Sequence, residues 1–196
     1  MWNKLGVNLI DITGVYDKAI QLTSPFFNER PESVQVSLLV VHCISLPEGV
    51  YGGKQIEQLF TGCLDCNQHP SFSDLEGLEV SAHCVIRRDG RVEQYVPFDK
   101  RAWHAGVSSF DGVEACNDYS IGIELEGTDK SAYTRAQYKA LSELTVELLN
   151  HYPLLTKQRI IGHSGIAPGR KSDPGYLFDW GYYFSLLPQD NTIGLG

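Results

Sequence analysis

The feature that most limits the folds open to this chain is the run Ser37-Leu-Leu-Val-Val-His-Cys43, which is short, almost continuously apolar and rich in β-branched residues. Runs of this kind are typical of strands that are buried on both faces. Such a strand needs a layer of structure packed on each side of its sheet. The run therefore favours an α/β fold, and it places His42 near the carboxyl end of a central strand.

Four further segments complete the pattern of a central mixed β-sheet flanked by helices. The dipeptide Asp89-Gly90 separates two β-rich runs and predicts a hairpin, because glycine tolerates positive φ. Residues 119–126 alternate apolar and polar, which predicts a strand with Glu124 and Glu126 opposite its apolar face. The capping box at 134–137 opens a helix that runs until Pro153, and residues 159–163 predict another strand, which ends in a histidine.

The length of 196 residues, with 42% hydrophobic and 20% charged residues, suits a single globular domain. No repeat, low-complexity tract or interdomain linker divides the chain. Residues 1–36 contain prolines at 25 and 31 and are expected to form an N-terminal lead-in packed on the core. We expect residues 37–187 to form the domain that carries the chemistry, and residues 188–196 to form a C-terminal tail.

The net charge of −8 and the pI near 5.2 argue against sequence-independent nucleic-acid binding, which needs a basic surface. The N-terminal residues include an acid before any apolar signal region, and no stretch is long enough to cross a bilayer. The five cysteines are an odd number, which fits a reducing compartment better than a disulfide framework. We therefore expect a cytoplasmic protein with neither a nucleic-acid nor a membrane partner.

Cys63 and Cys66 have the CxxC spacing that also occurs in zinc ribbons and thioredoxin-like sites. They begin residues 63–77, whose Asn, Pro, Ser, Asp and Gly predict a long loop after a short helix at 54–60. Neither a second CxxC nor a βαβ pattern accompanies them. Two buried or loop thiols are the favoured interpretation, and a structural zinc knuckle is the alternative.

Two histidines and an aspartate form a possible metal triad. His42 and His163 each end a short predicted strand, and Asp173 follows ten residues after His163 in a loop that can fold back. A catalytic zinc site needs three N, O or S ligands and one open position. The residues alone leave open that each histidine has a structural role. The remaining histidines are competing ligand candidates: His69, His83, His104 and His151.

Several longer motifs occur in a fixed order and are more specific. They are Leu38–His42, Ser81–Gly90, Gln94–Gly106, Asn117–Gly127, and Gly162-His163 with Arg170–Gly175. Through these motifs residues 37–180 resemble the type 2 N-acetylmuramoyl-L-alanine amidases, and in particular the cytosolic members that act in muropeptide recycling. The lead-in from Ser24 to Pro31 is similar as well. The resemblance implies the peptidoglycan-recognition-like α/β fold of that family, with the zinc amidase domain at residues 37–187.

The resemblance assigns His42, His163 and Asp173 as ligands of one catalytic Zn²⁺ ion. It assigns Glu124 as the group that accepts a proton from the attacking water and delivers it to the leaving alanine amine. A bound zinc ion lowers the pKa of water and so supplies the nucleophile. Glu126 lies on the same strand face and is the competing base, but the resemblance favours Glu124.

Three more side chains receive roles by resemblance or by chemistry. Lys171 is expected to stabilise the oxyanion, although a lone loop lysine is usually only solvated. Trp103 could offer its indole face to a sugar ring or be a core aromatic residue. Arg170 could hold a substrate carboxylate or be an ordinary surface residue. We expect Trp103 and Arg170 to bind substrate.

Three positions depart from the cytosolic members. Cys43 stands where those proteins have Asn, and Glu79 and Ala115 stand where they have Arg. These positions are associated with ligand binding, and replacing Arg by Glu reverses a charge. The departures affect the preferred glycan end and peptide length, whereas the metal ligands and the scissile bond are unchanged.

The expected activity is hydrolysis of the amide bond between N-acetylmuramic acid, in its 1,6-anhydro form, and L-alanine. Its partner is a soluble anhydromuropeptide, and no obligate protein partner is evident. A non-catalytic muropeptide-binding module is one alternative, against which the three intact ligand positions argue. A lytic amidase acting on intact peptidoglycan is the other, and it would usually carry an export signal, a wall-binding repeat or a basic surface.

Overall fold

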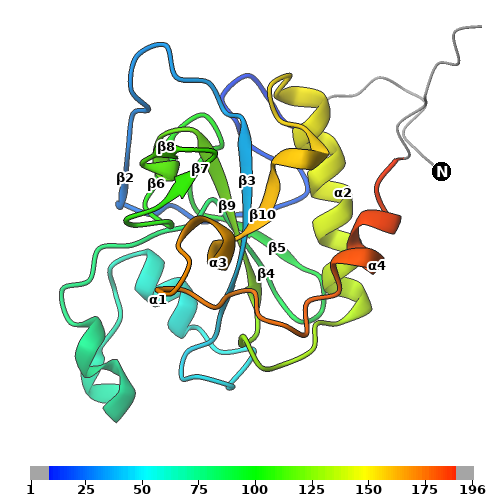
Figure 1. Cartoon of the computed structure of the whole chain (residues 1–196). Helices are drawn as coiled ribbons and strands as arrows, with labels where there is room; N and C mark the ends of the chain where they lie inside the picture. The colour runs from blue at the N-terminus through cyan, green and yellow to red at the C-terminus, as the bar shows by residue number, and fades with distance from the viewer. Residues whose placement is uncertain (1–8, 189–196) are drawn as a thin grey trace, which may run out of the picture.

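The structure, a computed structural model that describes residues 9–188, is built around two seven-residue strands, β3 (Leu38–Ile44) and β9 (Ser120–Glu126). They pair in parallel along their whole length, so that His42 lies beside Glu124. Four shorter strands extend this pair into a six-stranded sheet of order β1-β5-β4-β9-β3-β10 (Figure 1). The added strands are β1 (Ile20–Gln21), β4 (Cys84–Ile86), β5 (Val92–Gln94) and β10 (Ile160–Gly162).

The sheet is mixed, as predicted. β4, β9, β3 and β10 run parallel to one another, and β5 runs antiparallel to β4 through the predicted hairpin. Carboxyl ends of parallel strands meet at one edge of a sheet, and ligands of open α/β sheets bind at that edge. The residues that end β3 and follow β10 are therefore brought to the same side of the molecule.

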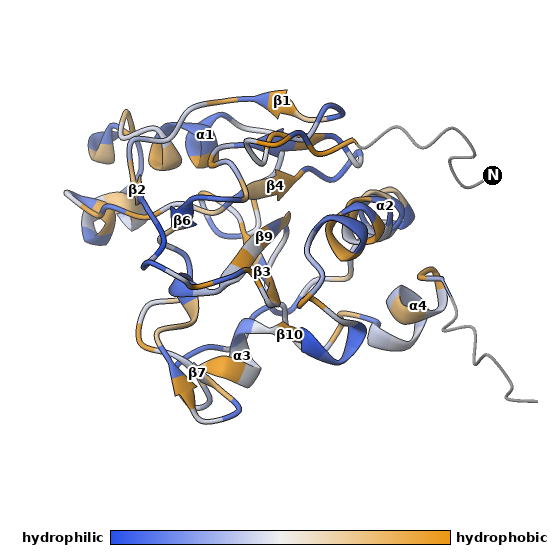
Figure 2. Cartoon of the chain, turned by 90° about the horizontal axis from the view of Figure 1, so that it is seen from above, coloured by the Kyte–Doolittle hydropathy of each residue, from blue (hydrophilic) through white to orange (hydrophobic). Residues whose placement is uncertain are grey.

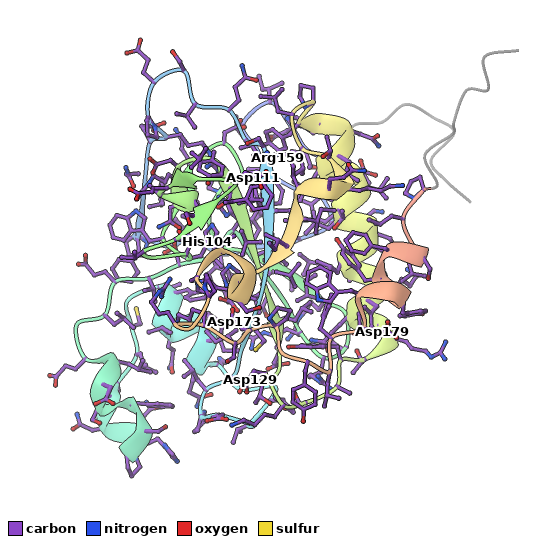
Figure 3. All side chains as sticks on the ribbon, viewed as in Figure 1. His104, Asp111, Asp129, Arg159, Asp173 and Asp179 are labelled. Atoms are coloured by element: carbon purple, nitrogen blue, oxygen red, sulfur yellow. The ribbon has the colours of Figure 1, made fainter. Side chains whose placement is uncertain are left out.

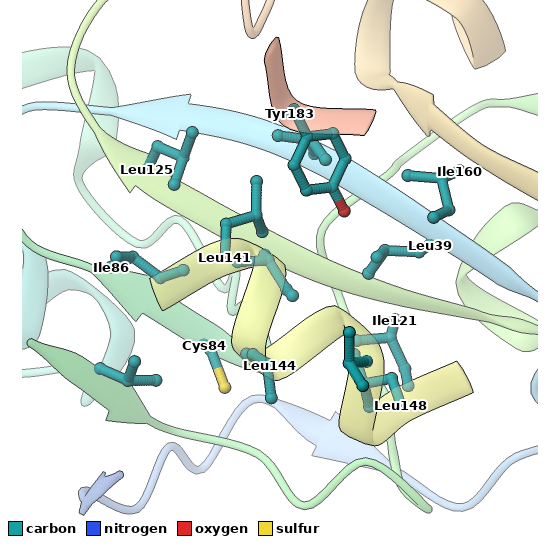
Figure 4. Packing of buried hydrophobic residues seen from close by; sticks show 14 of the residues in the cluster. Leu39, Cys84, Ile86, Ile121, Leu125, Leu141, Leu144, Leu148, Ile160 and Tyr183 are labelled. Carbon is teal, nitrogen blue, oxygen red and sulfur yellow. The ribbon is translucent and has the colours of Figure 1, made fainter. Parts of the chain in front are cut away.

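One face of the sheet is apolar and is covered by α2 (Arg135–His151) and α4 (Trp180–Ser185) (Figure 2). Alternate residues of the strands point toward these helices, as a period of two requires. Leu141, Leu144 and Leu148 of α2 pack on them at helical spacing (Figure 4). Fully burying a leucine of this kind contributes about 1.5–3 kcal/mol, so this layer carries much of the stability.

The opposite face carries two smaller apolar clusters with polar residues between them. One cluster joins Val85 of β4 to α1 (Gln55–Phe60), and the other joins Leu38 and Val40 of β3 to α3 (His163–Ile166). All seven residues of β9 are buried, including Glu124 and Glu126. The predicted alternation is confirmed, but the glutamate face is not a solvent face because α1, α3 and the connecting segments cover it.

The lead-in residues contact the sheet at several points. Ile10 and Tyr16 belong to the main core, and β1 pairs with β5 at the edge of the sheet. Arg30 donates to the backbone carbonyls of four residues: Phe98, Asn117, Asp118 and Ser120. This buried guanidinium ties the lead-in to the start of β9.

Two expectations about local structure need correction. Residues 63–77 are not all irregular, because η1 (Cys66–Gln68) and η2 (Pro70–Leu75) are 3₁₀ turns capped by Asp65 and His69. The strand predicted over 159–163 ends at Gly162, and His163 begins α3. The remaining short elements are β2 (Phe27–Asn28), β6 (Arg101–Ala102), β7 (Ser109–Phe110), β8 (Val113–Glu114), η3 (Cys116–Asp118) and η4 (Lys157–Arg159).

Within residues 9–188, no helix has the length and apolar character needed to cross a membrane.

The first prediction concerns the start of α2. Thr134 Oγ1 accepts from Gln137 N while Gln137 Oε1 accepts from Thr134 N, and Thr134 Oγ1 also donates to the Arg88 carbonyl. Thr134→Ala should lower the free energy of unfolding by about 0.5–2 kcal/mol, the usual cost of losing an N-cap. Urea unfolding followed by circular dichroism measures this, with Thr156→Ala as the control, because Thr156 precedes η4 without a side-chain cap. Equal stability of both variants would contradict the prediction.

Candidate active site

Three side chains from separate elements converge at the carboxyl edge of the sheet. His42 comes from β3, His163 from the first turn of α3, and Asp173 from the loop that follows α3. Their ligand atoms all lie within 4.8 Å of one another, and they form the one candidate metal cluster found in residues 9–188. The structure thus brings together the triad that the sequence proposed, with both histidines buried (Figure 3 labels Asp173, close to α3).

The three donor atoms are nearly equidistant. His42 Nδ1 lies 3.0 Å from His163 Nδ1 and 3.0 Å from Asp173 Oδ2, and His163 Nδ1 lies 3.1 Å from Asp173 Oδ2. Burial lowers the pKa of His42 to about 4. Burial alone would raise the pKa of Asp173, but hydrogen bonds and charge interactions with the two histidines bring it well below its usual value. At neutral pH the set therefore comprises a neutral imidazole from His42 and a carboxylate.

The donor set fits a metal ion. His163 Nε2 faces the Ala105 carbonyl at 3.1 Å, and a carbonyl only accepts, so in a neutral tautomer this nitrogen carries the proton. His163 Nδ1 is then a bare lone pair that points at His42 and at an anionic oxygen. A cation among the three atoms removes this conflict. Two imidazole nitrogens and a carboxylate oxygen that converge at these separations are donors that a divalent metal ion would accept.

Close contacts fold the loop of Asp173 back onto β10. Asp173 O accepts from Ser164 N at 3.0 Å, and Pro174 O accepts from Tyr133 OH at 2.6 Å. A Cβ on Gly162 would lie 2.6 Å from Pro174 Cδ, so only glycine allows this approach. The loop that carries Asp173, the third candidate ligand, therefore contacts β10, α3 and the segment before α2.

The two glutamates of β9 differ in their hydrogen-bond partners. Glu126 accepts from Gly52 N at 2.7 Å and Arg88 N at 3.0 Å, and it pairs with Arg87 at 3.2 Å. Glu124 Oε2, in contrast, is buried and has no hydrogen-bond partner in the described part of the chain. Burial, followed by the charge of Asp173, raises the pKa of Glu124 well above 4.5, while Lys171 opposes the shift. Perturbation by burial beside a charged cluster is typical of functional carboxylates.

Lys171 and Arg170 lie beside the triad, in a pocket that Asp173 also lines. Both line a pocket of about 470 Å³ together with Asp173 and Cys43. Lys171 is exposed, and its charge acts on both Glu124 and His42. Arg170 Nη2 donates to Ala105 O at 2.7 Å and to Val107 O at 2.6 Å. Part of the Arg170 fork is thus engaged with the backbone, and the guanidinium also lines a second pocket of about 610 Å³.

The three departing positions line pockets, whereas Trp103 lies outside them. The Trp103 indole donates to Asn28 Oδ1 at 2.7 Å, and its ring is half-buried near Phe26. Ala115 lines the second pocket with Arg170. Glu79 lines a third pocket of about 390 Å³, bordered by Phe26 and by Cys66. Trp103 does not line any of these pockets, so the structure does not place it directly against the triad.

The competing histidines have other partners. His83 Nδ1 accepts from Gly122 N, and His83 Nε2 faces the Lys100 carbonyl; both distances are 3.0 Å. Burial lowers the pKa of His83 to about 3, so the ring is a neutral structural group. His104 Nδ1 approaches His42 Nε2, on the side of that ring away from the triad. His69 caps η2, and His151 ends α2; neither belongs to the cluster.

All five cysteines are free, and neither Cys63 nor Cys66 contributes to the metal cluster of the described residues. Sequence reasoning treated Ala105 only as part of a motif. Its carbonyl holds His163, a role that belongs to the backbone and leaves no signal in the side chain. The motif Trp103–Gly106 is the one trace of it in the sequence.

The fold and the site define a type 2 amidase. Residues 32–176 match the family Amidase_2, N-acetylmuramoyl-L-alanine amidase. The chain belongs to this family, which confirms the expected family, fold and amidase activity.

Individual relatives agree with this assignment. The 1,6-anhydro-N-acetylmuramyl-L-alanine amidase AmpD of Citrobacter freundii is 56% identical over 170 residues, 87% of this chain and 90% of the relative. AmpD of Escherichia coli K12 is 54% identical over 174 residues, 89% of this chain and 94% of the relative. A crystal structure of a selenomethionine AmpD derivative superimposes with a TM-score of 0.89 at 54% identity, covering 92% of this chain and 99% of that one.

The environment of Glu124 generates a prediction about stability. A carboxyl whose folded-state pKa is raised binds more protons in the folded than in the unfolded state, so stability falls as pH rises from 4.5 toward the folded pKa. Glu124→Gln removes this dependence. In metal-free protein at neutral pH it should raise the free energy of unfolding by about 1–3 kcal/mol, because the neutral amide avoids the desolvation cost of a buried carboxylate.

Glu126→Gln is the matched control for urea unfolding, because it lies on the same strand and face. It should destabilise the protein by about 1–3 kcal/mol, since the buried Arg87 then keeps Glu93 but loses Glu126 as a charge partner. If Glu124→Gln is also destabilising, the carboxylate of Glu124 is structurally supported and our account of its environment is wrong.

Proposed function

We propose that this amidase is zinc-dependent and acts on 1,6-anhydro-N-acetylmuramoyl peptides, releasing peptides that begin with L-alanine, in peptidoglycan recycling. The AmpD relatives from two organisms carry this activity in their names. The E. coli amidase AmiD, solved with anhydro-N-acetylmuramic acid-L-Ala-D-gamma-Glu-L-Lys, matches with a TM-score of 0.57 at 27% identity over 82% of this chain and 65% of that one. His42, His163, Asp173 and Glu124 are the residues to which we assign this chemistry.

One observation carries the proposal. Three donor atoms lie 3.0–3.1 Å apart at the sheet edge, and the unpartnered Glu124 carboxylate stands beside them on the next strand. A bound zinc ion would polarise both water and the scissile carbonyl. Two histidines and a carboxylate leave a fourth position for this purpose, as in other catalytic zinc sites.

The protein residues supply proton transfer and charge. Glu124 accepts a proton from water as the water oxygen bonds to the lactyl carbonyl carbon. The carbon–nitrogen bond then breaks, and the proton passes from Glu124 to the alanine nitrogen, which leaves as an amine. Lys171 offers a positive charge to the carbonyl oxygen while that oxygen is negative. The raised pKa of Glu124 makes it a stronger base than an ordinary carboxyl.

The two pockets that Arg170 lines are the proposed substrate groove, one on each side of the arginine. Arg170 would hold a substrate carboxylate with the nitrogens that it does not share with the backbone. Trp103 lines neither pocket and lies near Phe26, so we propose that it contacts the sugar where the substrate extends beyond the two pockets. Cys43 and Ala115 line the two pockets, so two of the three departures from the cytosolic members fall where the substrate would lie, whereas Glu79 lines the third pocket.

A cytoplasmic site of action accords with five free cysteines and a net charge of −8. The same charge disfavours binding to anionic wall polymers, which supports a soluble fragment as substrate over intact peptidoglycan. We propose one amidase domain over residues 37–187, with the lead-in as part of its fold.

The reaction is tested by incubating purified protein with a soluble anhydromuramoyl tripeptide and analysing the products by mass spectrometry. We expect release of the free tripeptide, and its loss on treatment with a chelator or in Glu124→Ala. The Cys63→Ser, Cys66→Ser double variant is the control and should keep full activity. Cleavage of intact sacculi with no cleavage of the soluble substrate would instead support the lytic alternative.

Lys171 is tested separately by steady-state kinetics. Lys171→Ala should lower kcat by roughly 100- to 1000-fold, the usual effect of removing one oxyanion donor. Lys130 lines the same pocket and has no assigned role, so Lys130→Ala is the matched control. Similar kcat values for the two variants would show that Lys171 contributes only a positive charge to the groove and does not stabilise the oxyanion specifically.

A further inference from the structure

Both candidate histidine ligands direct Nδ1 toward the triad, so the Nε2 atom of each ring points away from it. Each Nε2 has a hydrogen-bond partner on that far side. His163 Nε2 faces the Ala105 carbonyl at 3.1 Å, and His42 Nε2 faces His104 Nδ1 at 2.9 Å. The two acceptors are consecutive residues of one segment. Partners behind a ligand histidine set its tautomer and its ring orientation.

The hydrogen bonds of His104 are consistent with one arrangement. Its Nε2 lies 3.1 Å from Ser120 Oγ, which can accept the ring proton. His104 Nδ1 is then a lone pair that accepts from His42 Nε2–H, and His42 Nδ1 is left as the lone pair that a metal needs. This chain of donors runs from the His42 ring to Ser120, at the start of β9.

Two features of the fold place the His104 ring against β9. The neighbouring Asn117 Oδ1 accepts from His104 N at 3.1 Å and from Ala105 N at 2.8 Å, so one buried amide fixes the backbone of both acceptor residues. A Cβ on Gly122 would lie only 2.4–2.7 Å from ring atoms of His104. Glycine at position 122 therefore leaves the space that the imidazole occupies, on the same strand as Glu124.

We propose that His104 is a positioning residue for the metal site, and that Gly122 serves it by leaving room for its ring. His104 holds the His42 ring so that Nδ1 faces His163 and Asp173. It does not itself coordinate the metal, because it stands on the far side of the His42 ring. This inference rests on the proposed zinc dependence, and it adds a residue to which neither the ligand set nor the proton-transfer step assigns a role.

The test is the dissociation constant for zinc, measured by competition with a chromophoric chelator, without substrate. His104→Ala should weaken zinc binding by about 10- to 100-fold, as loss of a partner behind a ligand does. His104→Asn should restore most of the affinity, because the Asn amide oxygen can occupy the position of Nδ1 and accept from His42. His69→Ala, at a histidine that caps η2, should bind zinc as the wild type does.

A double-mutant cycle separates positioning from general disruption. Gly122→Ala should also weaken zinc binding, because its Cβ displaces the His104 ring. In the His104→Ala background the same change should have little further effect, since the ring it would displace is absent. Thermal melting of the metal-free variants verifies that each is folded.

The outcomes distinguish this inference from the proposed function. If wild-type protein binds zinc and His104→Ala binds it equally well, the positioning role is wrong while the proposed function stands. Additive losses from Gly122→Ala and His104→Ala would also overturn the role, because the two residues would then act independently. A wild-type protein that binds no zinc would overturn both proposals.

Discussion

The parallel pairing of β3 with β9 is the constraint on which the rest of the site depends. Register places His42 beside Glu124 along a ladder of seven residue pairs, and a slip of one residue would turn either side chain to the opposite face. The apolar face of both strands is buried under α2, so a slip would also expose core residues. The hydrophobic layer on one face thereby fixes the relative positions of His42 and Glu124 on the other.

The two glutamates of β9 are the same residue type on the same face, but their surroundings give them different properties. Glu126 is paired with Arg87 and receives two backbone N–H groups, which compensate its burial. Glu124, two residues away on the same face, is buried without such compensation. Uncompensated burial is unfavourable for the fold, yet it keeps a carboxylate reactive toward protons. The neighbouring ion pair between Arg87 and Glu126 stabilises the part of β9 that carries Glu124.

Two glycines on the strands allow other segments of the chain to pack closely against the sheet near the candidate site. Gly122 leaves room for the His104 ring, and Gly162 leaves room for Pro174 beside Asp173. In both cases a missing Cβ lets a segment from elsewhere in the chain lie directly on the sheet. The candidate ligand set is therefore held by close packing on β9 and β10 as well as by hydrogen bonds.

The sequence by itself determined the mixed sheet, the hairpin, the start of α2 and the family, because these follow from local periodicity, turn chemistry and ordered motifs. It also proposed His42, His163 and Asp173 as a set. Tertiary structure decided the rest: that these three atoms lie within 3.1 Å, that Glu126 is engaged while Glu124 is not, and that Arg170 contacts the backbone. Distances and burial depend on contacts between residues far apart in the chain, which no local pattern encodes.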